Sequence, residues 1–117
     1  MFKQELLKFL KEIQSGHELD EWYLSNFVEE NIYPFSEEEA FSELNLVIKL
    51  IYENIDSVEI ISELMYIYMY LQRQSDTTEI PSFLSKHTNI FSLIQKKYKG
   101  TDLDDLAKDF IRIYHLQ

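Results

Sequence analysis

Residues 63–72 read ELMYIYMYLQ, and the centre of this stretch, residues 66–70, alternates tyrosine with apolar side chains as a β-strand does. A rotation of 100° per residue describes a longer stretch and also accounts for its polar flanks. One side of such a helix collects Ile60, Leu64, Ile67, Tyr68 and Leu71. The other side collects Glu59, Ser62, Glu63, Tyr66, Tyr70 and Arg73. The sequence therefore predicts a helix that is capped at Asp56 or Ser57 and runs to about residue 74.

The composition of the whole chain agrees with a helical fold. The 117 residues are 45% hydrophobic, which is enough for one domain over residues 1–117 with its own core. Only two glycines and two prolines occur, and the Asn-Gly and Asp-Gly pairs typical of β-hairpins are missing. We therefore expect an all-α protein, folded as a single compact bundle of five to six helices.

Apolar residues at helical spacing predict where the other helices lie. We expect them at about residues 2–14, 19–31, 37–54, 89–98 and from 101 onward, with a short helical turn opened by Pro81. The first two should form an antiparallel pair, because Gly16 suits the left-handed residue that ends a helix. Ser36 and Glu39 have the spacing of a capping box, in which each side chain bonds the backbone amide of the other.

The charge of the chain restricts its partners. With 21 acidic residues against 11 Lys and Arg, the net charge is −10. Such a chain repels nucleic acid and anionic lipid, since both bind through Lys and Arg, and it attracts basic proteins. There is no cysteine, which excludes disulfides and fits a cytoplasmic protein. No apolar run approaches the roughly 18 residues of a membrane span.

Residues that commonly carry catalysis or bind metals do not form a recognised pattern here. His17, His87 and His115 lack the carboxylate and histidine spacing of metal-binding helices. No phosphate-binding glycine loop or nucleophile turn is present. The acids at positions 102, 104, 105 and 109 are candidates for a divalent cation, but acids are also favoured at the start of a helix. We expect no enzyme, no metal and no cofactor.

The polar side of the helix at residues 57–74 is the best candidate for a binding surface. It places Glu59, Glu63, Tyr66 and Tyr70 in line, with tyrosines as anchors and acids to attract a basic partner. Steering charges at the start of the preceding helix complete the predicted partner-binding set: Glu37, Glu38 and Glu43. A second interpretation stays open, in which Tyr66 and Tyr70 pack inside the bundle.

The amino-terminal half also carries a resemblance to known proteins. Residues 6–28 read LLKFLKEIQSGHELDEWYLSNFV, and residues 36–52 read SEEEAFSELNLVIKLIY. This pattern resembles small acidic bacterial immunity proteins, especially the helical colicin D type and those paired with contact-dependent toxins. The resemblance implies that the chain binds a cognate toxin domain, often a nuclease, and blocks it by acidic complementarity. No binding residue is carried over from it.

A function of another class is also compatible with the sequence. The chain would then be a helical adaptor or regulatory protein, acting without catalysis as a homodimer or as a scaffold subunit. Tyr66 and Tyr70 would form the hydrophobic seam between subunits.

Overall fold

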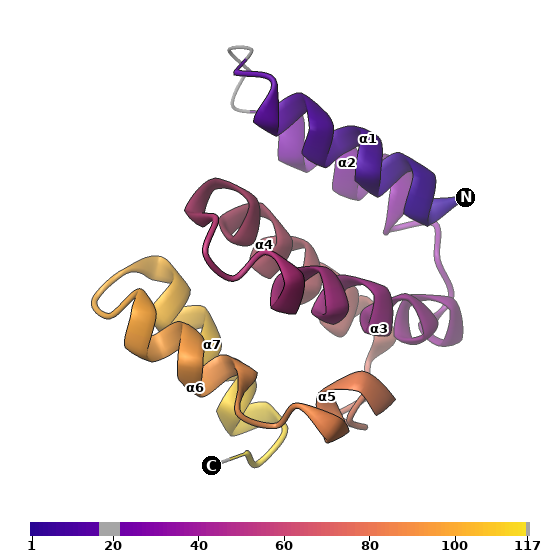
Figure 1. Cartoon of the computed structure of the whole chain (residues 1–117). Coiled ribbons are helices and arrows are strands. Elements are labelled where there is room, and N and C mark those ends of the chain that lie inside the picture. Colours follow the sequence, from indigo (N-terminus) through magenta and orange to yellow (C-terminus); the bar gives the residue numbers. More distant parts are fainter. Residues whose placement is uncertain (17–21, 117) are drawn as a thin grey trace.

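A computed structural model describes residues 1–16 and 22–116, and over these ranges the chain forms seven helices and no strand (Figure 1). The helices are α1 (Phe2–Gln14), α2 (Tyr23–Asn31), α3 (Glu37–Glu53), α4 (Val58–Ser75), α5 (Ser82–Lys86), α6 (Ile90–Lys97) and α7 (Asp102–Ile113). The prediction of an all-α fold is confirmed. The predicted number of five to six helices is too low, because the turn that Pro81 opens continues as a separate short helix, α5.

Local signals set the ends of several helices. The bounds of α1 agree with the prediction, and Gly16 adopts a left-handed φ of 77° just beyond its end. The predicted start of the second helix near residue 19 lies outside the described residues. At α3 the capping box forms: the amide of Ser36 donates to Glu39 Oε1 at 2.9 Å, and the amide of Glu39 donates to Ser36 Oγ at 3.2 Å. These bonds lower the pKa of Glu39.

Six of the helices form three antiparallel pairs, and α4 belongs to the central pair. In Figure 1 the α1–α2 pair lies above the central α3–α4 pair, and the α6–α7 pair lies below and to the left. Contacts link α4 to α3 most extensively, and also to α1, α2 and α7, whereas α5 packs on α3. The chain thus folds around α4, the helix that contains the tyrosine-rich stretch.

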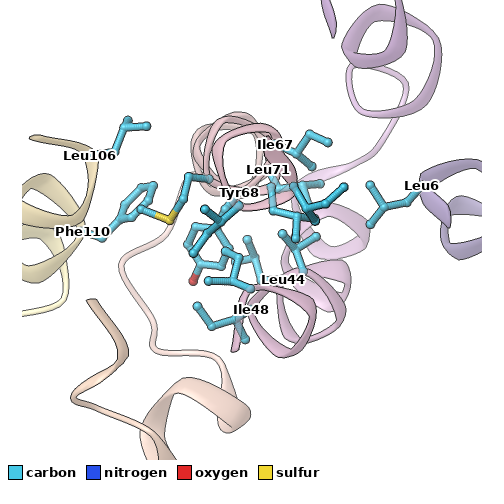
Figure 2. Packing of buried hydrophobic residues seen from close by; sticks show 14 of the residues in the cluster. Leu6, Leu44, Ile48, Ile67, Tyr68, Leu71, Leu106 and Phe110 are labelled. Atoms are coloured by element: carbon cyan, nitrogen blue, oxygen red, sulfur yellow. The ribbon is translucent and has the colours of Figure 1, made fainter. Parts of the chain in front are cut away.

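The core confirms the helical interpretation of that stretch. Every residue predicted on the apolar side of α4 is buried, and Ile61 and Met65 widen the buried face. Figure 2 shows Leu6 approaching α4 from α1, Leu44 and Ile48 from α3, and Phe110 from α7. Each large apolar side chain that is buried in this way stabilises the fold by about 1.5–3 kcal/mol.

Polar contacts attach the outer helices to the central pair. The hydroxyl of Tyr98, which follows α6, donates to the carbonyl of Ile55 at 2.6 Å. Lys97 forms an ion pair with Asp56 at 2.8 Å. On the other side of α3, Asn45 holds the start of α5: its Nδ2 donates to Ser82 Oγ at 3.1 Å, and its Oδ1 accepts from the amide of Phe83 at 2.9 Å. The connection between α3 and α4 and the middle of α3 are therefore both fixed to later segments of the chain.

Candidate protein-binding site

The four α4 residues predicted to bind a partner lie along one line of the helix. Glu59, Glu63, Tyr66 and Tyr70 are separated by four, three and four residues, a spacing that keeps them on one face. This face is turned away from the buried residues Ile60, Leu64 and others that pack on the core. Glu59 is exposed, and the other three are partly buried. We call these four residues the α4 strip.

Tyr66 lies between carboxylates from two different helices. Its pKa is raised first by burial and then by the nearby carboxylate of Asp102. Glu63 and Tyr70 raise the pKa further. Asp102 is the first residue of α7, so this helix brings an additional acid to the α4 strip. The phenol ring of Tyr66 is thus held in place, with its polar end in a negatively charged environment.

Glu63 occupies the most constrained position of the α4 strip. Its Oε2 atom is buried and has no hydrogen-bond partner within the described ranges. Burial raises the pKa of this carboxyl group, because desolvation disfavours the charged form. A cationic group of a partner would instead meet the accessible part of this partly buried carboxylate, where a charge-assisted hydrogen bond is stronger than at a fully hydrated acid.

The two tyrosines of the α4 strip differ from the core tyrosine between them. Tyr68 is completely buried, whereas Tyr66 and Tyr70 are partly buried and pack against the edge of the core. Each keeps part of its ring accessible to solvent. The arrangement therefore allows these two rings to contribute both to packing and to the contact with a partner.

The predicted steering charges lie away from the α4 strip. Glu37 and Glu38 are exposed at the start of α3. They line a hollow of about 280 Å³ beside the end of α4, together with Phe41, Ser75, Asp76, Thr77 and Glu79. Sixteen residues of α4 separate Glu59 from Ser75, or about 24 Å at 1.5 Å per residue, whereas five separate Tyr70 from Ser75, or about 8 Å. The hollow therefore lies beyond the Tyr70 end of the α4 strip and far from Glu59. We call this second region the acidic hollow.

Glu43 belongs to neither region. It is partly buried, and it lies one turn from Ala40 and Val47, which are buried. Burial raises the pKa of the Glu43 carboxyl group. The sequence placed this residue among the surface acids because its neighbours in sequence, Ser42 and Leu44, do not show which side of α3 other helices cover.

Several residues near these regions were not predicted. The sequence pattern marks Asp102 as an acid at the start of a helix and as a candidate for a cation, and it assigns Phe41, Asp76 and Glu79 to no surface. The segment 75–82 contains charged residues, but only the packing of α3 against α4 brings them beside Glu37 and Glu38.

The described residues contain no group of three or more His, Asp and Glu side chains that could hold a metal ion. Two of the acids on α7 are engaged locally. Asp104 accepts a hydrogen bond from the amide of Gly100 at 2.9 Å, and Asp109 pairs with Arg112 at 3.2 Å. None of the helices in the described part of the chain is long and apolar enough to cross a lipid bilayer.

Comparisons of the chain with known protein families, with curated proteins and with solved structures found no match.

Proposed function

We propose that this chain is a non-catalytic inhibitor that binds a basic protein, and that the partner is a cognate bacterial toxin domain of the nuclease class, met in the cytoplasm. The observation that supports the proposal best is the α4 strip. It combines two partly accessible tyrosines with three carboxylates, from Glu59, Glu63 and Asp102. The resemblance of residues 6–55 to immunity proteins agrees with this function.

The chemistry of the α4 strip fits a cationic partner. A nuclease binds its phosphate substrate through Lys and Arg, so a surface of carboxylates competes for the same groups. Tyrosine rings add contact area at a low cost in conformational entropy. The net charge of −10 attracts a basic partner from a distance and speeds the encounter.

Glu37, Glu38 and Glu43 have a weaker role in this proposal. Glu37 and Glu38 lie beyond the Tyr70 end of the α4 strip and about 24 Å along the helix from Glu59, which is about three times the screening length of about 8 Å at physiological salt. They steer a partner only through the overall field, and Glu43 contributes less because its side chain is partly buried. Neutralising these three acids should lower the association rate at low salt and leave the dissociation rate unchanged.

The proposal is tested by truncating the two tyrosines. The Tyr66→Ala, Tyr70→Ala double variant should bind the partner at least tenfold more weakly, mainly through faster dissociation, since each anchor contributes on the order of 1–2 kcal/mol. Tyr33→Ala is the matched control, because Tyr33 is 53% exposed and lies outside the α4 strip. The basic polypeptide encoded immediately upstream is the partner to use, captured by co-expression and pull-down.

The readout separates binding from packing. Thermal unfolding of the double variant is measured beside its affinity. Unchanged affinity of the folded protein would show that Tyr66 and Tyr70 serve only the core and would refute the proposed contact. A wild-type dimer that the double variant converts to a monomer would instead support the alternative, a homodimer with a tyrosine seam.

A further inference from the structure

A second hollow lies along the seam between α3 and the chain that follows α4. Its lining is basic and apolar rather than acidic: Asn45, Leu46, Lys49, Ser82, Phe83 and Lys86. Its volume is about 280 Å³, equal to that of the acidic hollow. Tyr52, which is 47% exposed, borders it and contacts the rings of Phe83 and His87. We call this region the lysine hollow.

The two hollows lie on the same side of the molecule. Glu38, Asn45 and Lys49 are seven and four residues apart, so they follow one stripe of α3. The segment 75–86 borders this stripe: residues 75–79 line the acidic hollow, and residues 82–86 line the lysine hollow. Eleven residues separate Glu38 from Lys49, which is about 16 Å along the helix. One face therefore carries acids at one end and lysines at the other.

The charges of this face have no partners within the described part of the chain. No ion pair there includes Lys49 or Lys86, and none includes Glu37, Glu38, Asp76 or Glu79. At about 16 Å the acids and lysines of one copy are too far apart to form ion pairs with each other. Partly buried apolar side chains, Phe41, Leu46 and Phe83, lie between and beneath them.

We propose that this face pairs with the same face of a second copy of the chain. A two-fold axis near Asn45 would place the lysine hollow of each copy over the acidic hollow of the other. Such an isologous contact needs a surface that is complementary to itself, and a face with opposite charges at its two ends meets that condition. The pairing forms two sets of Lys–Glu contacts and covers the apolar side chains between them.

The pairing is weak and reversible. Two copies that each carry a charge of −10 repel one another, and exposed ion pairs contribute little individually. The α4 strip stays accessible in the pair, because α3 packs on the opposite side of α4. The contact between copies is therefore independent of the proposed inhibitor function, and each pair presents two α4 strips.

Charge reversal tests the pairing. The first variant is Lys49→Glu, Lys86→Glu, and the second is Glu37→Lys, Glu38→Lys. Sedimentation velocity over a roughly hundredfold range of concentration should show dimers for the wild type and monomers for each variant alone. An equimolar mixture of the two variants should form dimers again. In the mixed dimer the lysine hollow of the first variant, now acidic, faces the acidic hollow of the second, now basic, and the two unchanged hollows face each other. The chain that carries all four substitutions should also form dimers.

Controls with the same change in charge are available away from the face. Lys3→Glu, Lys11→Glu on α1 matches the first variant, and Glu29→Lys, Glu30→Lys on α2 matches the second; all four residues are exposed. Both controls should form dimers like the wild type. A monomeric wild type at the highest concentration, dimers in both charge-reversal variants, or a mixture that stays monomeric would each overturn the proposal. Circular dichroism confirms that every variant is folded before it is compared.

Discussion

The buried pair of Tyr68 and Tyr114 gives a quantitative test of the core. Tyr68 is 0% exposed and Tyr114 is 3% exposed, and their hydroxyl oxygens are 2.9 Å apart. The rings of Phe91 and Phe110 pack edge-on against Tyr68, with centroids 6.0 and 5.1 Å away. Each hydroxyl therefore depends on the other for its hydrogen bond.

Removing one hydroxyl should cost more than removing both. Tyr114→Phe leaves the Tyr68 hydroxyl buried without a partner, a penalty of about 1–3 kcal/mol. Tyr68→Phe has the corresponding effect on Tyr114. In the double variant no polar group is left unpaired, so the free energy of unfolding should fall by less than about 1 kcal/mol. The loss in the double variant should then be smaller than the sum of the two single losses by at least about 1 kcal/mol.

Thermal and denaturant unfolding measure this coupling. For a chain of this size, 1 kcal/mol lowers Tm by about 3–6 °C. Each single variant should therefore melt several degrees below the wild type, and the double variant should melt close to it. Additive losses, with the double variant less stable than either single one, would refute the hydrogen-bonded pair. Unchanged m-values would show that the compactness of the unfolded state is the same.

The same pair predicts how stability depends on alkaline pH. Burial raises the pKa of Tyr114 to about 12, from a usual value of 10.0. The unfolded chain then loses this proton at lower pH than the folded chain, so the stability is complete below pH 10 and is lost as the pH rises toward 12. A difference of this size corresponds to about 2–3 kcal/mol. Tyr114→Phe should flatten this part of the stability curve, and an unchanged slope would contradict the assignment.

Four further substitutions test other parts of the fold. Ser36→Ala removes one half of the capping box and should lower the free energy of unfolding by about 1 kcal/mol in urea titrations. Ile48→Asp and Ile67→Asp place an unpaired charge in the core and should each cost about 3–5 kcal/mol; a well-folded variant with a normal melting curve would show that the packing is wrong. Glu63→Gln should raise the free energy of unfolding at pH 7 by up to about 1 kcal/mol, since it removes a partly desolvated charge. This gain should disappear at acid pH, where Glu63 of the wild type is itself protonated. A loss of stability at pH 7 would mean that the carboxylate has a partner.

The sequence predicts the helices well where one face is apolar over several turns. The helix α4 is an example: its apolar period extends far beyond the alternating residues 66–70, so the helical interpretation prevails over the strand. The short helix α5 shows the limit of this approach. Its five residues are too few to show a period, and its first-turn amide, that of Phe83, is bonded by Asn45 of α3. A side chain 38 positions away in sequence thus supports the start of this helix.

The candidate site, too, could be predicted only where it lies within one helix. The α4 strip lies within one helix, so its alignment could be predicted from spacing alone. The position of Asp102 beside Tyr66 depends on the packing of α7 on α4, and the acidic hollow depends on the packing of α4 against α3. Neither contact can be predicted from the spacing of residues within one helix. For this reason the sequence pattern groups Glu37 and Glu38 with the whole α4 strip, although they lie beyond its Tyr70 end and about 24 Å along the helix from Glu59.

The partial burial of the α4 strip has a consequence for affinity. A tyrosine that is free in solvent loses side-chain entropy when it binds, a cost of about 0.5–1.5 kcal/mol. Tyr66 and Tyr70 already pack against the core, and the Tyr66 hydroxyl lies near the carboxylate of Asp102. Much of this cost is therefore met during folding, so a partner would meet two rings that are held in place. Asp102→Ala should accordingly weaken binding by more than the loss of its charge alone, whereas Asp105→Ala, at an exposed acid on the same helix, should change only the association rate. Equal effects of the two substitutions would show that Asp102 contributes charge alone.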